Sequence, residues 1–261
     1  MKKITIIGGD DRFKKIKKGL ENNGFTVDTL GLFEEDFADI KSSDILLLPV
    51  PTTRDNKTVF APLTDKKILL NDIEKLSLGK QVLGCNYKLK AENYIDYGAL
   101  NSYAILNAVP TAEGAIKIAI ENTPFTIWNS KILVIGYGRV GKILADRLKA
   151  LGANVTVSAR KDSDFATLNA LGFNYINTNE LNSNKLCFNI IFNTVDFEVL
   201  SPKSLENTTA TLLVDLSSKG GFDLEFAKLK GITAIKAPSL PAIYSIDTAA
   251  EILLYTVLSL I

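Results

Sequence analysis

The chain has 261 residues, enough for one large domain or two of ordinary size. Its 30 basic and 29 acidic side chains nearly cancel, so no overall charge points to nucleic acid or a membrane as a partner. The absence of histidine excludes a histidine-based triad, a histidine general base and a histidine-ligated metal site, and we predict no bound metal.

The N-terminal part of the chain alternates between buried-strand and helical patterns. Lys3–Gly8 predicts a first strand, and a basic amphipathic helix should follow as far as Asn23. The inward face of this helix should carry Phe13, Ile16 and Leu20. Further strands are expected at Phe25–Leu30, Asp44–Val50 and Gln81–Asn86. The alternation predicts a small parallel α/β domain over residues 1–109, which we expect to hold the substrate.

A helix is expected where a second domain begins. Pro110–Thr123 has its proline near the first turn, and Glu113 lies where the helix dipole favours a negative charge. This helix should carry the chain into a cofactor-binding domain over residues 110–245.

The strongest motif is a glycine-rich turn that follows Ile132–Ile135, a short apolar run typical of a buried strand. Three glycines then follow in the spacing G-x-G-x-x-G. The first permits a tight turn, the second lets a pyrophosphate approach the backbone, and the third allows close helix packing. The motif predicts dinucleotide binding, and the alternative is a turn whose glycines serve packing only. The predicted cofactor-binding residues of this turn are Gly136, Tyr137, Gly138, Arg139, Val140 and Gly141.

The next strand, Asn154–Ser158, indicates which dinucleotide is bound. An NAD site usually carries an acidic residue near this strand end to bind the ribose 2′-hydroxyl. This chain has Ser158, Arg160 and Lys161 instead, and a hydroxyl with two cations can bind a 2′-phosphate. We therefore predict NADP(H) over NAD(H). The alternative is that both cations are solvated charges at the start of a loop.

The remaining apolar runs complete the architecture. Strands are expected at Phe188–Val195, Thr211–Leu216 and Thr233–Ala237, and a helix at Asp223–Lys230. The apolar C-terminal segment, residues 246–261, should form a helix packed on the first domain. The fold class is thus α/β, with two Rossmann-like domains, parallel sheets and linking helices. In such folds ligands bind at the carboxyl ends of the strands, so we expect a cleft between the domains.

The two cysteines, Cys85 and Cys187, lack C-x-x-C spacing and lie in apolar runs, so we expect buried thiols in a reducing cytosol. The N-terminal apolar run is too short for a signal peptide, and no stretch has the length of a membrane span. A cytoplasmic protein is expected.

Several segments resemble those of one known family in order and spacing. They are GGDDR, LLLPVPTT, LNAVPTAEGAIKIAIENT, VIGYGRVGK, SARK, FNTV and VDLSSKGGFD. Together they resemble the A subunit of dipicolinate synthase from spore-forming bacteria. VDLSSKGG also resembles the corresponding loop of alanine dehydrogenases, which share a two-domain architecture.

The resemblance implies an NADP-dependent oxidoreductase of dipicolinic acid biosynthesis in the mother cell during sporulation. Dihydrodipicolinate, formed from hydroxy-tetrahydrodipicolinate, would be oxidised to dipicolinate together with the B subunit of dipicolinate synthase. This chain departs from the family at Lys219-Gly220-Gly221 and over residues 239–250. Two alternatives stay open: another NADP-dependent dehydrogenase of a small carboxylate, of the alanine dehydrogenase or hydroxyacid type, or a non-catalytic NADP-binding subunit. A homo-oligomer also stays open.

A planar dicarboxylate needs cationic or hydroxyl donors, and arginine presents a flat pair of donors to a carboxylate. Arg12 and Arg54 follow strands of one predicted sheet; the alternative for either is an ion pair with a neighbouring aspartate. The predicted substrate-binding residues are Arg12, Thr52, Thr53, Arg54 and Lys88.

The late loops of the cofactor domain should face the nicotinamide. Asn193 and Thr194 should border the ribose and nicotinamide, and Ser217 should close the pocket with Ser218 and Lys219. The candidate catalytic residues are Lys219, Ser218 and Tyr244, and the proton acceptor could be Lys219, Tyr244 or an ordered water. Asp215 is expected to be a buried structural carboxylate.

Overall fold

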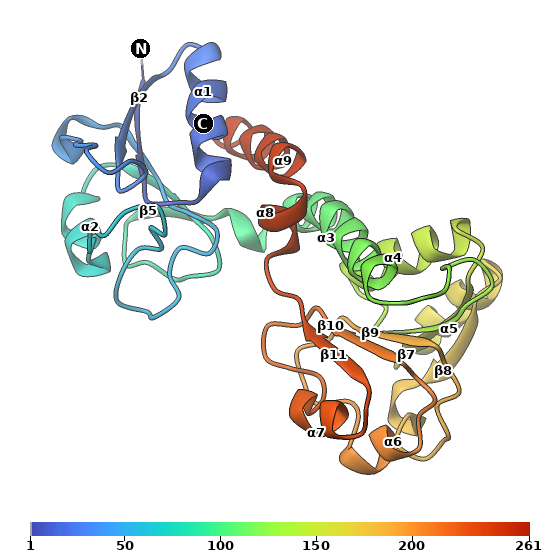
Figure 1. Cartoon of the computed structure of the whole chain (residues 1–261). Coiled ribbons are helices and arrows are strands. Elements are labelled where there is room, and N and C mark those ends of the chain that lie inside the picture. The colour runs from blue at the N-terminus through green and yellow to red at the C-terminus, as the bar shows by residue number, and fades with distance from the viewer. Residues whose placement is uncertain (1) are drawn as a thin grey trace. The chain divides into compact units, whose positions relative to one another are not determined.

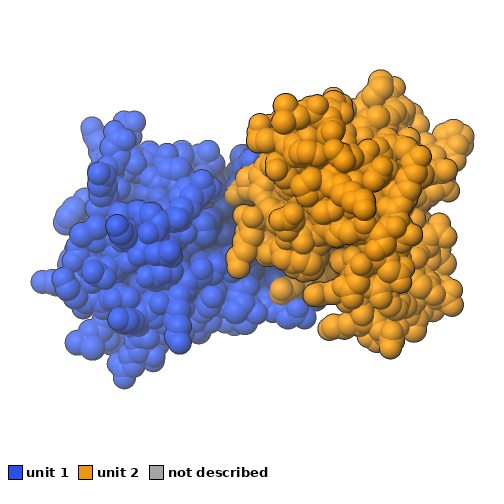
Figure 2. Space-filling view, turned by 90° about the horizontal axis from the view of Figure 1, so that it is seen from below, with its two compact units in different colours: residues 1–107, 241–261 blue, residues 108–240 orange. Residues whose placement is uncertain are grey.

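The computed structural model describes residues 2–261 and divides them into two compact units (Figure 2). Unit 1 contains the chain up to Asn107 together with Pro241–Ile261, and unit 2 contains Ala108–Leu240. Each unit is built on one parallel sheet.

The sheet of unit 1 has five parallel strands in the order β2-β1-β3-β4-β5. They are β1 (Lys3–Ile7), β2 (Thr26–Leu30), β3 (Ile45–Leu47), β4 (Gln81–Gly84) and β5 (Asn93–Asp96). The predicted parallel domain is confirmed, but β3 is shorter than expected. Pro49 and Pro51 carry no N–H group, so the ladder cannot continue to Val50.

Two helices at opposite ends of the sequence pack together in unit 1 (Figure 1). Helix α1 (Asp11–Asn22) buries Phe13, Ile16 and Leu20, as predicted, and α9 (Ile246–Leu258) packs on it. A Cβ at Gly19 of α1 would lie 2.3 Å from Leu254 Cδ2, so glycine permits this close approach. Helix α2 (Leu70–Leu76) completes the unit with short 3₁₀ turns at Ile40–Ser42 and Tyr97–Ala99.

The loop after β2 is organised by the carboxylate of Asp36, which accepts hydrogen bonds from the amides of Gly31 (2.7 Å), Leu32 (2.8 Å) and Phe33 (3.0 Å). Lys66 Nζ lies 2.9 Å from Asp36 Oδ1. Burial opposes the charge, but these hydrogen bonds outweigh it and lower the pKa of Asp36 from 3.8 to about 2.

Asp36 should therefore stabilise the fold above pH 3.8 and lose that contribution as the pH falls towards 2. We expect Asp36→Asn to unfold at lower urea concentration than the wild type at neutral pH, with the difference shrinking in this acid range. Circular dichroism during urea titration, repeated at several pH values, measures the unfolding midpoint of each protein and how the difference between them changes with pH. Glu34→Gln, in the same loop, is the control. A difference that stays constant down to pH 2 would contradict the assignment.

Helix α3 (Asn101–Glu121) passes from unit 1 into unit 2. The prediction that it begins at Pro110 is wrong, because Pro110 lies inside the helix. A proline in a helix interior costs about 3 kcal/mol. The continuous helix is favoured by burial on both sides of this proline. Tyr103 is buried in the core of unit 1, and Ala112 is buried in the core of unit 2.

Unit 2 contains a six-stranded parallel sheet in the order β11-β10-β9-β6-β7-β8. Its strands are β6 (Lys131–Ile135), β7 (Asn154–Ala159), β8 (Asn174–Asn177), β9 (Ile190–Asn193), β10 (Leu212–Asp215) and β11 (Thr233–Lys236). The strand order reverses between β6 and β9, the point where a doubly wound sheet binds its ligand. The predicted Rossmann-like organisation is confirmed.

Helices cover both faces of this sheet. They are α4 (Arg139–Ala150), α5 (Asp162–Ala170), α6 (Pro202–Glu206) and α7 (Leu224–Leu229), with a 3₁₀ turn at Thr178–Glu180. Helices α3 and α4 share one core with Val134, and α6 and α7 share the other with Leu133. The short α8 (Leu240–Tyr244) spans the unit boundary.

Cys85 is buried as predicted, whereas Cys187 is exposed, because it precedes β9 instead of lying in it. Within residues 2–261, no helix combines the length and apolar character needed to cross a bilayer. The same residues hold no group of three or more metal-ligating side chains placed to bind an ion.

Candidate active site

The three glycines after β6 meet different steric conditions. Gly136 has φ +99°, and a Cβ there would lie 2.5 Å from Val195 Cγ1. A Cβ at Gly141 would lie 2.0 Å from the carbonyl oxygen of Gly136, so the helix can approach the turn only with glycine there. A Cβ at Gly138 would meet nothing within 4 Å. The open side of Gly138 fits a pyrophosphate, and the other two glycines hold the turn beside it.

The other residues of the turn lie at the start of α4. Arg139 is exposed, and Tyr137 and Val140 are half-buried. Lys142 Nζ lies 4.9 Å from the centroid of the Tyr137 ring. Gly138 is the N-cap and has no side chain to accept from the first amides of α4. Those amides and the helix dipole therefore favour an anion at this point.

Ser158 lies in β7, next to its last residue. It is fully buried within β7, its Oγ accepts from Thr178 Oγ1 (3.1 Å), and it lies 3.3 Å from the amide of Gly136. Both faces of a parallel sheet are covered, so a serine inside the strand is removed from solvent. The contact of its hydroxyl with a ribose phosphate stays a prediction.

Arg160 and Lys161 follow β7 directly and are both exposed. The β6–β7 register aligns Ile135 with Ser158, which brings these cations to the sheet edge that carries the glycine turn. The guanidinium carbon of Arg160 lies 5.1 Å from the ring centroid of Phe197, which is 41% exposed. No sequence pattern pointed to Phe197, which lies in the loop after β9.

A buried polar network organises the loops after β9 and β10. The Asp215 carboxylate is fully buried and accepts from Asn193 Nδ2 (2.8 Å), Ser217 Oγ (2.7 Å), Lys236 Nζ (2.9 Å) and two backbone amides. Burial raises the pKa of Asp215, but these hydrogen bonds outweigh it and leave the pKa lowered. Asp215 is the buried structural carboxylate that was predicted.

Two predicted cofactor contacts belong to this network. Asn193 is fully buried and also donates to the Val195 carbonyl, while Ser217 is buried with its hydroxyl directed to Asp215. Their side chains position the loops, and their contact with the cofactor stays a prediction. Thr194 is half-buried and donates to the Ile135 carbonyl (2.8 Å), beside the glycine turn.

The predicted catalytic residues Ser218 and Lys219 are exposed in the loop after β10. Asp196 Oδ1 accepts from the amide (2.6 Å) and hydroxyl (2.9 Å) of Ser218, which ties this loop to the one after β9. Tyr244, the third candidate, ends α8 and is 37% exposed.

Unit 1 carries the predicted substrate residues, but Arg12 is already engaged. Its Nε and Nη2 donate to the two Asp10 oxygens (2.9 and 2.8 Å), and Nη2 also donates to the Val50 carbonyl (2.9 Å). Burial opposes the positive charge, but Asp10 outweighs it, so the pKa of Arg12 is raised. These donors are directed to Asp10 and Val50, and the substrate contact of Arg12 stays a prediction.

The two threonines of the loop after β3 also have structural roles. Thr52 is fully buried and accepts from the amide of Cys85 (2.8 Å). Thr53 donates to Asp55 Oδ1 (3.0 Å) and accepts from the Asn56 amide (3.1 Å). Both hydroxyls fix the backbone, and their contact with substrate stays a prediction.

Arg54 and Lys88 are exposed. The Arg54 guanidinium carbon lies 4.1 Å from the centroid of the Phe60 ring, a cation–π contact. The Phe60 carbonyl accepts from the Gly9 amide (2.9 Å), which fixes this residue beside the loop after β1. Phe60 thus orients Arg54, a role that no sequence pattern indicated.

Comparisons with known proteins agree with this organisation. Residues 3–106 match the family model of the N-terminal domain of the dipicolinate synthase A subunit. Residues 112–192 match that of the D-isomer specific 2-hydroxyacid dehydrogenase NAD binding domain. Unit 2 is therefore a dehydrogenase-type domain for a nicotinamide cofactor.

Whole-chain relatives extend this agreement. The dipicolinate synthase A subunit of Bacillus subtilis is 30% identical and aligns with 96% of this chain and 93% of its own. The crystal structure of the Bacillus halodurans counterpart superposes with TM-score 0.89 at 28% identity, covering 99% and 97% of the two chains. D-lactate dehydrogenase of Escherichia coli shares the fold. It superposes with TM-score 0.63 at 15% identity, covering 99% of this chain and 95% of the dehydrogenase chain. The chain belongs to the family of dipicolinate synthase A subunits.

Proposed function

We propose that this chain is an NADP-dependent oxidoreductase that oxidises dihydrodipicolinate to dipicolinate and works with the B subunit of dipicolinate synthase. The observation that carries the proposal is the exposed pair Arg160 and Lys161 at the sheet edge of the glycine turn, in a chain of this family.

The choice of NADP over NAD rests on charge. A carboxylate at the end of β7 would accept from a ribose hydroxyl and repel a phosphate. Here the two residues after β7 are cations, and a guanidinium can donate two parallel hydrogen bonds to a phosphate. These two cations therefore suit the 2′-phosphate of a phosphorylated adenosine ribose.

The substrate carboxylates need donors, and Arg54 and Lys88 are the predicted residues whose charged groups are exposed. The Phe60 ring holds the Arg54 guanidinium in one orientation, which lowers the entropy lost when a carboxylate binds. We assign the main carboxylate contact to Arg54.

The reaction asks mainly for orientation and exclusion of water. Bound NADP⁺ supplies the hydride acceptor, and a proton leaves the ring as it becomes aromatic. Among the candidates, Lys219 and Ser218 lie in a loop that Asp196 holds at the carboxyl edge of unit 2. We propose that Lys219, Tyr244 or an ordered water receives the proton.

The test is NADP⁺ reduction with freshly generated hydroxy-tetrahydrodipicolinate, with and without the B subunit, followed by the ultraviolet absorbance of the aromatic product. We expect dipicolinate and NADPH to form in equal amounts. NADPH binding without turnover in either mixture would contradict the enzymatic proposal. Turnover of a hydroxy acid or alanine instead would reassign the substrate.

Arg54→Lys should raise KM for the substrate about tenfold with little change in kcat, because a lysine cannot present the paired, ring-stacked donors of arginine. Steady-state kinetics at saturating NADP⁺ measures both constants. Lys57→Ala, an exposed cation of the same loop, is the matched control. Unchanged KM in Arg54→Lys would remove this residue from the substrate site.

A further inference from the structure

One loop of unit 1 holds an aromatic side chain out in the solvent. Phe37, in the loop after β2, is 84% exposed, and Phe33 of the same loop is 40% exposed. The loop is fixed, because the Asp36 carboxylate accepts from three of its backbone amides and is paired with Lys66. An exposed ring on a fixed loop adds nothing to the core and loses little entropy when a partner covers it. Aromatic anchors of protein interfaces have these properties.

This Phe37 loop, residues 31–40, also carries a strong local charge. It contains four acidic side chains and no basic one, and the segment 61–67 beside it adds one acid and two lysines. Glu34 and Glu35 are both exposed. Within residues 2–261 neither of them takes part in an ion pair, whereas Asp36 is paired. The surface formed by the two segments is therefore negative, and two of its acids have no counter-charge.

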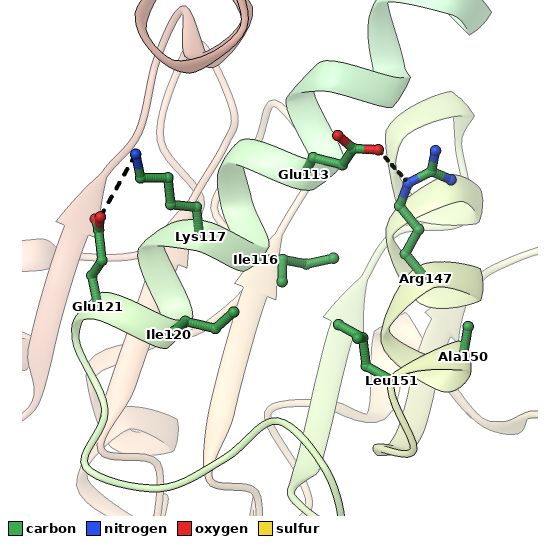
Figure 3. Close-up of a pocket in the computed structure, with 8 residues that line it drawn as sticks. All are labelled: Glu113, Ile116, Lys117, Ile120, Glu121, Arg147, Ala150 and Leu151. Atoms are coloured by element: carbon green, nitrogen blue, oxygen red, sulfur yellow. Dashed lines mark hydrogen bonds and ion pairs between the residues drawn. The ribbon is translucent and has the colours of Figure 1, made fainter.

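Acids of helix α3 differ in this respect (Figure 3). Glu113 pairs with Arg147 (3.2 Å), and Glu121 pairs with Lys117 (3.8 Å). These carboxylates already have a counter-charge, so a basic partner would gain less from them. The Phe37 loop offers a basic partner acids that are not yet paired.

A hollow of about 740 Å³ lies beside the Phe37 loop. It is lined by Glu34, Pro62, Leu63, Thr64, Asp65 and Lys66. Because Lys66 is engaged by Asp36, the remaining charged groups of the lining are the two acids, Glu34 and Asp65. A lysine or arginine side chain of a partner suits this hollow, with its apolar stem along the proline and leucine and its charge at the acids.

The Phe37 loop lies against the segment that carries the proposed substrate residue. A Cβ at Gly31, the first residue of the loop, would lie 3.5 Å from Ala61 Cβ and 3.8 Å from Gly8 Cα. Ala61 directly follows Phe60, whose ring holds the Arg54 guanidinium. A partner seated on the loop would therefore lie next to the part of unit 1 that is proposed to bind substrate.

The charge of the loop decides which partner fits. A second copy of the chain, placed by a two-fold axis on the same loop, would bring acids onto acids. Anionic lipid headgroups would be repelled in the same way. We propose that the Phe37 loop docks the B subunit of dipicolinate synthase, which would cover Phe37 with an apolar pocket and place a lysine or arginine in the hollow. This inference rests on the proposed partnership with the B subunit.

Isothermal titration calorimetry of the full chain with the purified B subunit tests the contact. We expect Phe37→Ser to weaken binding about tenfold or more, because truncation of an aromatic anchor is among the largest losses at an interface. Its circular dichroism and NADPH affinity should equal those of the wild type. Leu78→Ser, at the 82% exposed Leu78 of the same unit, is the matched control and should bind the B subunit normally.

Equal affinity of Phe37→Ser and the wild type for the B subunit would overturn the docking site and leave the partnership intact. A wild type that does not bind the B subunit would overturn both, and NADP⁺ reduction by the chain alone shows separately whether the proposed reaction stands. Binding of the wild type to phosphatidylglycerol vesicles or to itself that Phe37→Ser removes, with B-subunit binding unchanged, would assign the loop to another occupant and overturn the proposal.

Charge reversal tests the electrostatic part of the contact. Glu35→Lys should slow association with the B subunit and weaken binding several-fold at low salt, and the difference from the wild type should shrink as salt is added. Glu92→Lys makes the same change of charge at an exposed acid directly before β5, at the opposite edge of the sheet, and should bind normally. Equal effects of the two substitutions would show that only the overall charge matters and would contradict a local contact.

Discussion

Arg160→Ala is expected to weaken NADPH binding roughly 10- to 100-fold, because a hydrogen bond to a charged group contributes about 1.5–3 kcal/mol. NADH binding should hardly change, since NADH has no 2′-phosphate for Arg160 to contact. Arg160→Asp should lose more NADPH affinity than the alanine variant, because a carboxylate repels the phosphate. Fluorescence titration with NADPH and with NADH measures the affinity of each variant and of the wild type for both cofactors.

The comparison between cofactors is its own control, since a variant that misfolds would lose both. Lys161→Ala should show the same selectivity with a smaller loss, because lysine offers a single point charge. Equal loss of NADPH and NADH affinity would instead indicate a general role of Arg160 in the adenosine pocket. Unchanged NADPH affinity in Arg160→Asp would leave this arginine a solvated surface charge.

Asp215→Asn is expected to destabilise unit 2 by about 3 kcal/mol or more, the usual cost of removing one partner of a buried charge pair. The carboxylate accepts five hydrogen bonds. Asparagine would replace one of its two acceptor oxygens with an NH₂ group, which would face groups that are themselves donors. A Cβ at Gly221 would lie 2.0 Å from Asn193 Nδ2, so the network has no room to rearrange on that side.

Trp128 is the chain's single tryptophan and belongs to unit 2, so its fluorescence during urea unfolding reports this unit. Glu225→Gln, which removes an exposed ion pair with Lys228, should cost less than about 1 kcal/mol and serves as control. The lowered pKa of Asp215 means that its contribution is present above pH 3.8 and disappears as the pH falls through the folded-state value. A loss no larger than that of the control would contradict a central role for this carboxylate.

Much of the scaffold could be predicted because it depends on local patterns. Continuous apolar runs such as Ile132–Ile135 are typical of strands covered on both faces, and the glycine spacing defines the turn and helix start after β6. The strands β5 and β8 were missed because Asn93–Asp96 and Asn174–Asn177 have four residues each, with a polar residue at both ends. They form because each pairs with a strong neighbouring strand, which is a tertiary effect.

The site was harder to predict than the fold. Sequence identifies which side chains could bind a ligand but not which already have partners, and Arg12 and Ser158 both have internal partners. Phe60 and Phe197 carry no chemical signal of their own, and their relation to Arg54 and Arg160 exists only in three dimensions.

A crystal structure of the chain with NADP⁺ is the most direct test of the proposed cofactor site. We expect the pyrophosphate against the open side of Gly138 and the 2′-phosphate within hydrogen-bonding distance of Arg160 or Lys161. A 2′-phosphate that contacts neither cation, or a dinucleotide bound away from the carboxyl edge of β6 and β7, would contradict it.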